Sequence, residues 1–367
     1  MFIKDRNSNF ELLRIMAMVM IVAHHFSIYG NFKFSADYIT INRVWIQFIQ
    51  IGGKIGVDIF VLISGYFLVN VEKMKMDRML KYWSQLIFYS ISLYFLCVAL
   101  GVIVFDYKTM IVCLFPILSR QWWFASTYFV LYLMSPFLNI LLKQLSREKY
   151  LKMLLLMTVC WCIIPTFFST SFESNDLIWF MYLYAVSGYI RIWQKEIKLR
   201  ITSKKAFGMA IAVLLIMYMI VIVFDLLGIR VDFFVDKYVH FYNQNQLPIL
   251  LISLMVFIGF KNLSIKNNRI INCISMATFG VYLIHDNASV RLFLWNGIFR
   301  SADYSESVFL IPYSLGVIML VFICCTIMDL VRSIFLEKLY LGFYNKLVTW
   351  LNKIIEKIIK KYVIKNI

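Results

Sequence analysis

The stretch LLRIMAMVMIVAHHF, residues 12–26, decides the fold of this chain. It has the composition of a membrane helix, yet it carries Arg14, His24 and His25. On insertion scales an arginine at the centre of a membrane helix costs roughly 2.5–3.5 kcal/mol. The helix must therefore turn this side chain towards a partner, the protein interior or a wet cavity rather than towards lipid.

The rest of the chain is equally apolar. Of its 367 residues, 62% are hydrophobic, and the mean hydropathy is +0.77, which excludes a soluble domain of this length. Segments of about 17–25 apolar residues can span a bilayer. We therefore predict an all-α integral membrane protein, a bundle of about ten transmembrane helices. The predicted segments are 10–29, 44–70, 80–104, 122–142, 150–168, 177–194, 205–228, 245–260, 271–290 and 308–331.

The basic residues predict how the bundle is oriented. Of 37 lysines and arginines, 27 fall in alternate connections and at the chain ends, within 1–9, 70–81, 143–152, 191–205, 261–269 and 332–367. Positive residues accumulate on the cytoplasmic side of membrane proteins, so both termini are predicted to be cytoplasmic. The net charge of +17 is then explained by topology and contact with anionic membrane lipids, not by nucleic-acid binding.

The transmembrane domain is predicted to span 1–335, followed by a basic tail at 336–367. In this tail apolar residues recur every three or four positions and lysines fill the other face; the apolar positions are Leu336, Leu339, Phe343, Leu347, Trp350, Ile354 and Ile358. This pattern predicts an amphipathic helix on the inner membrane surface. The same pattern would also serve a helix that docks on a partner protein.

The seven cysteines give no sign of a metal site. Most of them lie inside apolar runs, and none forms a CxxC pair with histidines at zinc spacing. We predict neither a metal site nor a disulfide framework.

One face of the first helix carries several polar residues. At about 100° per residue, Arg14 and His25 share a face within roughly 20° and stand about 16 Å apart, whereas His24 is offset by roughly 80°. Glu11 lies one turn before Arg14 and can pair with it. A structural Glu11–Arg14 pair, with His25 reaching the outer interface, is one interpretation. The other is a reactive site, because histidine accepts protons near neutral pH and arginine binds phosphate or carboxylate.

Several motifs resemble the membrane acyltransferase-3 family. ELLRIMAMVMIVAHHF, residues 11–26, places Glu11, Arg14 and His25 at the positions of that family's acidic residue, arginine and histidine. GVDIFVLISGYFL (56–68) resembles the second helix, and Arg78 in MKMDRMLKYW (74–83) matches the arginine that follows it. The stretches QWWFASTYFVLYLMSPFLN (121–139) and TFGVYLIHD (278–286) resemble later signatures. The resemblance extends over residues 8–331.

The resemblance implies a specific activity. It implies about ten helices around a transverse tunnel, acyl-CoA (acetyl-CoA) entering from the cytoplasm as co-substrate, and an acceptor hydroxyl, usually on a sugar, lying further out. In this reading His25 is the general base, Arg14 and Arg78 bind the donor, and Glu11 completes the catalytic set. No permanently bound cofactor is implied. The implied location is the plasma membrane of a bacterium, with lipids as partners and a homodimer as one option.

Four further residues have two interpretations each. Asp58 either makes a helix-pairing contact, for example with Lys54, or orients the reaction centre. Trp122 and Trp123 suit an outer aromatic belt, with sugar stacking as the alternative. His285 suits the outer interface, with catalysis as the alternative.

Three functions compete at this level. The first is O-acylation of a cell-envelope or exopolysaccharide sugar. The second is transport or flipping of a polysaccharide or lipid-linked sugar through a polar path. The third is an interaction protein that recruits partners through its basic tail. The shared Arg14–His25 face favours the first, and the sequence shows no internal repeat of the kind that would favour the second.

Overall fold

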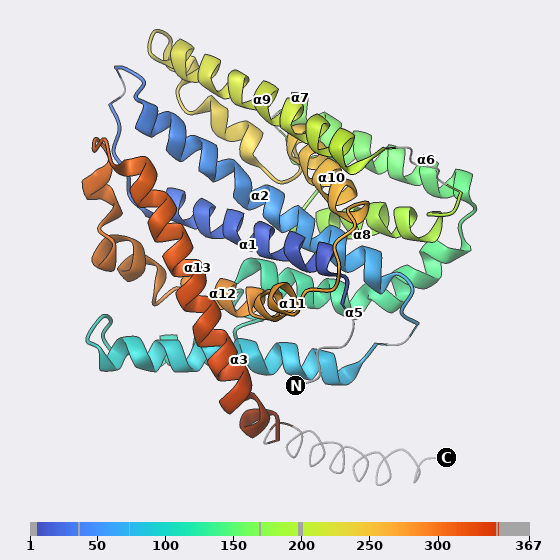
Figure 1. The fold of residues 1–367 in the computed structure, drawn as a ribbon, viewed down its shortest axis with the longest axis horizontal. Helices are drawn as coiled ribbons and strands as arrows, with labels where there is room; N and C mark the ends of the chain where they lie inside the picture. The colour runs from blue at the N-terminus through green and yellow to red at the C-terminus, as the bar shows by residue number, and fades with distance from the viewer. Residues whose placement is uncertain are drawn as a thin grey trace.

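The computed structural model describes residues 6–35, 37–72, 74–168, 170–196, 201–342 and 344. Within these ranges all regular structure is helical, which confirms the predicted all-α class (Figure 1). The α-helices are α1 (Ser8–Tyr29), α2 (Ile41–Leu68), α3 (Met76–Ala99), α4 (Tyr107–Leu114), α5 (Trp123–Gln144), α6 (Arg147–Thr158), α7 (Ile164–Phe167), α8 (Asp176–Ile192), α9 (Ser203–Gly228), α10 (Leu247–Lys261), α11 (Arg269–Met276), α12 (Thr278–His285) and α13 (Leu310–Phe335). The π-helical turns are η1 (Val159–Ile163) and η4 (Phe293–Ile298), and the 3₁₀ turns are η2 (Asp232–Phe234), η3 (Lys237–Tyr242) and η5 (Ser301–Tyr304).

Eight helical segments in the described part of the chain are long and apolar enough to cross a membrane, when Arg147–Phe167 (α6, η1 and α7) and Asp232–Lys261 (η2, η3 and α10) are each counted as one segment. Two of the ten predicted segments form shorter helices. Segment 177–194 forms α8, which has 17 residues, and segment 271–290 forms the α11–α12 pair, which is interrupted at Ala277. The protein is therefore a multi-pass helical membrane protein, whereas the count of ten spans and the cytoplasmic termini stay predictions.

Helices α1 and α2 run side by side through the middle of the molecule (Figure 1). Their close approach depends on glycines in α2. A Cβ at Gly56 would lie 2.6 Å from the carbonyl oxygen of Ala17, and one at Gly53 would lie 2.2 Å from Cγ of His24. Small residues let membrane helices pack backbone to backbone, so α2 holds α1 in a fixed position.

The opposite side of α2 packs on α8 in the same way. A Cβ at Gly65 would lie 2.8 Å from the backbone of Tyr184. The hydroxyl of Ser64 donates to the carbonyl of Phe60 in its own helix at 2.8 Å. Gly65 therefore serves the close packing of α2 on α8.

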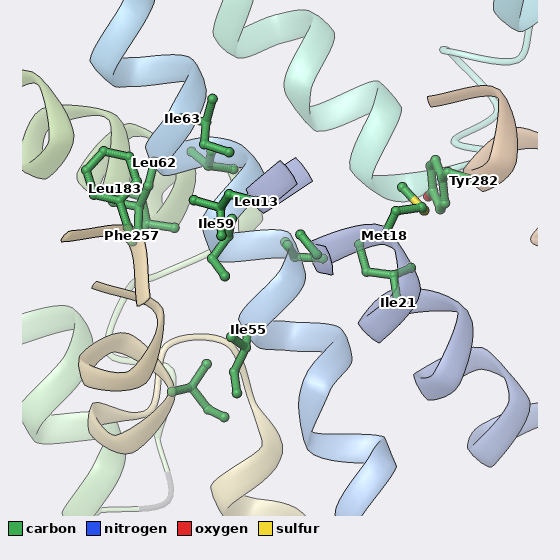
Figure 2. Close-up of a cluster of buried hydrophobic side chains, with 14 of the residues drawn as sticks. Leu13, Met18, Ile21, Ile55, Ile59, Leu62, Ile63, Leu183, Phe257 and Tyr282 are labelled. Atoms are coloured by element: carbon green, nitrogen blue, oxygen red, sulfur yellow. The ribbon is translucent and has the colours of Figure 1, made fainter. Parts of the chain in front are cut away.

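An apolar cluster joins this central pair to neighbouring helices (Figure 2). Helices α1, α2, α8, α10 and α12 contribute to it; the residues labelled in Figure 2 are Leu13, Met18, Ile21, Ile55, Ile59, Leu62, Ile63, Leu183, Phe257 and Tyr282. This packing fixes the rotation of α1 about its own axis. The polar face of α1 is thereby held towards α3, α5, α12 and α13.

The beginning of the predicted tail helix belongs to the described residues. Glu337 accepts from Lys81 at 2.5 Å and from Arg332 at 3.1 Å, which ties residues just after α13 to α3. The rest of the predicted amphipathic helix lies outside the described residues, including Phe343, Leu347, Trp350, Ile354 and Ile358.

Candidate active site

Arg14 and His25 lie on the wall of one cavity, which has a volume of about 400 Å³. The shared helix face predicted from their spacing therefore borders a single space. Seven helices, α1, α2, α3, α5, α11, α12 and α13, contribute side chains to the wall of this cavity. Lining residues include Arg6, Arg14, Met18, His24, His25, Lys54, Phe60, Ser64, Lys81, Tyr82, Gln85, Trp123, Phe124, Tyr128, Thr278, Tyr282, Arg332 and Glu337.

The guanidinium of Arg14 is held by Glu11. Its Nη1 lies 2.9 Å and 3.1 Å from the two carboxylate oxygens of Glu11, which also accept from Ser275 Oγ at 2.5 Å and from Arg6 Nη1 at 3.4 Å. Glu11 is 6% exposed, whereas the side chain of Arg14 is 28% exposed. Glu11 thus holds the Arg14 guanidinium and leaves part of it exposed on the cavity wall.

Other cations line the same cavity as Arg14. Arg6, Lys81 and Arg332 line the cavity together with Arg14. Arg332 is buried, and it donates to Asp329 at 2.8 Å and to Glu337 at 3.1 Å. Because a cluster of guanidinium and ammonium groups attracts phosphates, this end of the cavity suits a phosphate-bearing molecule.

Arg78 lies beside this cavity rather than in it. It lines a neighbouring cavity of about 250 Å³, and Arg14, Ser64, Tyr82 and Tyr128 line both spaces. Of the two predicted donor-binding arginines, Arg14 therefore borders both cavities and Arg78 borders the smaller one.

His25 is held by a second histidine that comes from α12. Its Nδ1 lies 2.8 Å from Nε2 of His285, and Nδ1 of His285 lies 2.5 Å from the carbonyl oxygen of Val281. A carbonyl can only accept, so neutral His285 carries its proton on Nδ1 and presents a lone pair at Nε2. His25 must then donate from Nδ1, which leaves the lone pair of neutral His25 on Nε2.

A carboxylate stands near that lone pair. Oδ2 of Asp286 lies 3.9 Å from Nε2 of His25, and Oδ1 of Asp286 lies 3.5 Å from Nη1 of Arg291. Arg291 also donates to the hydroxyl of Tyr29 at 3.0 Å. A proton gained by His25 at Nε2 would therefore be stabilised by Asp286. His285 and Asp286 are both buried, so His285 does not lie at a water-exposed outer interface as one interpretation predicted.

His24 also borders the cavity, despite its offset of roughly 80° from Arg14. Its Nδ1 lies 2.6 Å from the carbonyl oxygen of Gln50, so this nitrogen donates. The absence of a side chain at Gly53 makes room for the His24 ring. The cavity is wide enough to include both histidines, but only His25 is backed by a second imidazole.

Asp58 is completely buried and is paired differently from the predicted contact with Lys54. Its Oδ1 accepts from Nε1 of Trp179 at 3.0 Å, and its Oδ2 has no hydrogen-bond partner in the described structure. The Nζ of Lys54 lies 4.9 Å from the ring centre of Trp123 instead. Asp58 thus ties α2 to α8, and Lys54 is left beside the cavity.

The two neighbouring tryptophans have separate environments. Trp123 lines the cavity, where the ammonium of Lys54 lies over its ring. Trp122 is 1% exposed and lies in the core, so the prediction of an outer aromatic belt is wrong for this residue. The reason is local, because Trp122 is the N-cap of α5 and its side chain turns inwards at the helix start.

Sequence reasoning missed several residues of this site. Tyr82, Tyr128 and Arg332 line the cavity, and Asp286 stands behind His25. The first three are ordinary interfacial residue types and carried no signal. Asp286 follows His285 in the quoted stretch TFGVYLIHD, and an intramembrane acid beside a histidine is a signal that could have been used. No cluster of three or more His, Cys, Asp or Glu residues that could hold a metal ion occurs among the described side chains.

Fold and cavity together define a multi-pass helical membrane protein with a cavity that charged side chains line. A sequence model described as an acyltransferase domain, that of the acyltransferase-3 family, matches residues 7–330. The chain therefore belongs to the acyltransferase-3 family, as its motifs predicted, and is a membrane acyltransferase. Neither a curated protein nor a solved structure matches the chain.

Proposed function

We propose that this protein is an O-acyltransferase, and specifically an O-acetyltransferase, that uses acyl-CoA as donor and a sugar hydroxyl as acceptor. The sugar belongs to the cell envelope or to an exopolysaccharide, and the reaction takes place at the plasma membrane of a bacterium. One observation carries the proposal: Arg14, in a group of cations, and His25, with its lone pair on Nε2, border the same cavity.

The cationic end is where the donor binds in this proposal. CoA carries several phosphates, and guanidinium groups bind phosphate oxygens in bidentate fashion. Arg14 is fixed by Glu11 and Arg332 by Asp329, so both cations are held in place before the donor arrives. Arg78 contributes from the adjoining cavity.

The histidine end is where the acyl group is transferred. The acceptor O–H gives its proton to Nε2 of His25 while its oxygen forms a bond to the thioester carbonyl carbon. The carbon–sulfur bond then breaks, and the leaving thiolate takes the proton from the imidazolium. The products are the sugar ester and free CoA, so atoms and charges balance.

Two neighbours support His25 in this step. His285 accepts the Nδ1 proton of His25 at 2.8 Å and so keeps the lone pair on Nε2. Asp286, at 3.9 Å, stabilises the positive charge that His25 gains. Both act through His25, which makes them positioning residues rather than catalytic ones.

The proposed donor side is the cytoplasm. Three of the cavity's cations belong to basic segments of the chain: Arg6 to 1–9, Lys81 to 70–81 and Arg332 to 332–367. Positive residues accumulate on the cytoplasmic side of a membrane protein. His25 lies about 16 Å further along α1. The acyl group would therefore be carried part of the way through the bilayer on the narrow pantetheine arm of CoA.

Transport or flipping of a sugar is the second candidate. One observation favours it: a second cavity, of about 430 Å³, adjoins the first and shares Lys54 with it. Two neighbouring cavities with polar linings are a feature that a transporter would need.

The deciding experiment supplies purified protein with labelled acetyl-CoA and a sugar acceptor. The proposal expects label on the sugar and free CoA from the wild-type protein, and neither product from His25→Ala. Sugar crossing a sealed vesicle membrane unacetylated, with no free CoA formed, would support the transporter instead.

A further inference from the structure

The second cavity differs in chemistry from the donor cavity. Its walls come from α2, from α7, α8 and the segment between them, and from η3 and the residues before α10. Most of its lining side chains are uncharged and polar. The lining residues are Lys54, Pro165, Thr170, Ser171, Ser174, Asn175, Asp176, Trp179, His240, Asn243, Gln244, Asn245 and Gln246.

The amide side chains are oriented by groups that can only accept. Nε2 of Gln246 donates to the carbonyl of Pro165 at 3.3 Å, and Nδ2 of Asn245 donates to that of Trp161 at 3.3 Å. Nε2 of Gln244 donates to a carboxylate oxygen of Asp176 at 3.1 Å. The NH₂ group of each amide is therefore engaged, and each carbonyl oxygen is left as an acceptor.

Two of these oxygens are buried without a partner. Gln246 is 2% exposed and Gln244 is 9% exposed, and Oε1 of neither residue has a hydrogen bond in the described structure. A buried acceptor with no partner is costly. Both residues line the cavity, so a ligand with hydrogen-bond donors would satisfy these oxygens.

The charges of the cavity also limit the ligand. The carboxylate of Asp176 is occupied, because its other oxygen accepts from Arg120 at 3.0 Å. Nε2 of His240 donates to the carbonyl of Thr166 at 2.9 Å, which leaves its Nδ1 as a further acceptor. Lys54 supplies the cation where the two cavities meet. Such a wall favours an uncharged, hydroxyl-rich molecule.

We propose that this second cavity is the acceptor site, and that it binds a neutral saccharide through the amide oxygens of Gln244, Asn245 and Gln246. This inference rests on the proposed function and specifies its substrate class. Because Lys54 lines both cavities, the bound sugar lies next to the cavity that His25 borders, and a sugar hydroxyl can approach the acyl group there.

The test measures sugar binding without any donor, using full-length purified protein in lipid nanodiscs. The probes are methyl glucoside, which is neutral, and methyl glucuronoside, which is anionic. We expect methyl glucoside to bind the wild-type protein, to bind at least tenfold more weakly to Gln246→Leu, and to outcompete methyl glucuronoside. The matched control is Gln144→Leu, an exposed position at the end of α5 outside the cavity, which should bind like wild type.

Gln246 is nearly fully buried, so Gln244→Leu and Asn245→Leu, nearer the rim, provide second variants. Unchanged affinity for acetyl-CoA shows that each variant is folded. Absence of methyl glucoside binding to wild type, equal binding by all the variants, or tighter binding of methyl glucuronoside would overturn the acceptor site. Loss of acyl transfer with this binding pattern intact would instead refute the proposed function alone.

Discussion

The two ends of the main cavity are built in different ways. At the Arg14 end the side chains are charged and paired, with Arg14 on Glu11 and Arg332 on Asp329. At the His25 end the key groups are imidazoles, ordered by hydrogen bonds to another imidazole or to backbone carbonyls. Fixed charges suit binding of a charged donor, whereas a directed lone pair suits proton transfer. In the proposed reaction, helix α1 therefore carries a donor-binding group and a proton acceptor about three turns apart.

The largest effect should come from the histidine end. His25→Ala removes the proposed base, and general-base catalysis contributes about 10²–10⁴-fold, so transfer should fall by that factor. Acetyl-CoA affinity should stay near the wild-type value, because the donor cations are untouched. Transfer at the wild-type rate in His25→Ala would contradict the claim that the His25 end of the cavity serves proton transfer.

Substitution of His285 should have the second-largest effect on the rate of transfer. His285→Phe leaves Nδ1 of His25 without its acceptor; a hydrogen bond to a group that becomes charged is worth about 1.5–3 kcal/mol, or about 10–150-fold in rate. His285→Gln restores an acceptor oxygen and should recover part of kcat. Both variants should keep the wild-type KM for acetyl-CoA. Equal kcat in the Phe and Gln variants would argue against this positioning role.

Substitutions at the cationic end of the cavity should weaken the binding of acetyl-CoA. Arg14→Ala and Arg78→Ala should raise the Kd for acetyl-CoA about tenfold or more, since charged hydrogen bonds contribute about 1.5–3 kcal/mol. Arg14→Lys keeps the charge but loses the bidentate fork, so it should weaken binding by less than Arg14→Ala. Isothermal titration measures each Kd. If neither alanine variant binds acetyl-CoA more weakly, the donor site lies elsewhere.

The smallest effect concerns packing near His24. In Gly53→Ala the new methyl group would lie 2.2 Å from Cγ of His24, and overpacking of this kind costs about 1–3 kcal/mol. Gly208→Ala is the matched control, because nothing lies within 4 Å of its Cβ position. Thermal unfolding should show a lower Tm for Gly53→Ala only. A Tm equal to that of the control would show that α1 and α2 can separate without cost.

Part of this site follows from local sequence. Arg14 and His25 are on one helix, so the helical period alone predicts their shared face, and the structure gives them a common cavity. The Glu11–Arg14 pair is likewise local, at a spacing of three residues. The apolar segments predicted the helical class in the same way, because each segment reports its own tendency to insert in a membrane.

The remainder depends on contacts between distant segments. His285 reaches His25 across 260 residues, and Asp58 pairs with Trp179 instead of its neighbour Lys54. Spacing within a helix cannot give either contact, because the packing of α12 on α1 and of α8 on α2 determines them. Trp122 shows the same limit. A tryptophan suits the membrane interface, but at the start of α5 this side chain is buried in the core.

The most direct test of the central claim uses sealed inside-out vesicles that contain the purified protein. Acetyl-CoA labelled in its acetyl group is added outside, at the face corresponding to the cytoplasm, and a neutral sugar is enclosed in the lumen. The account predicts labelled sugar ester in the lumen with wild-type protein and none with His25→Ala. Labelled ester formed only when donor and sugar are on the same side of the membrane would contradict a cavity that joins a cytoplasmic donor to an acceptor further out.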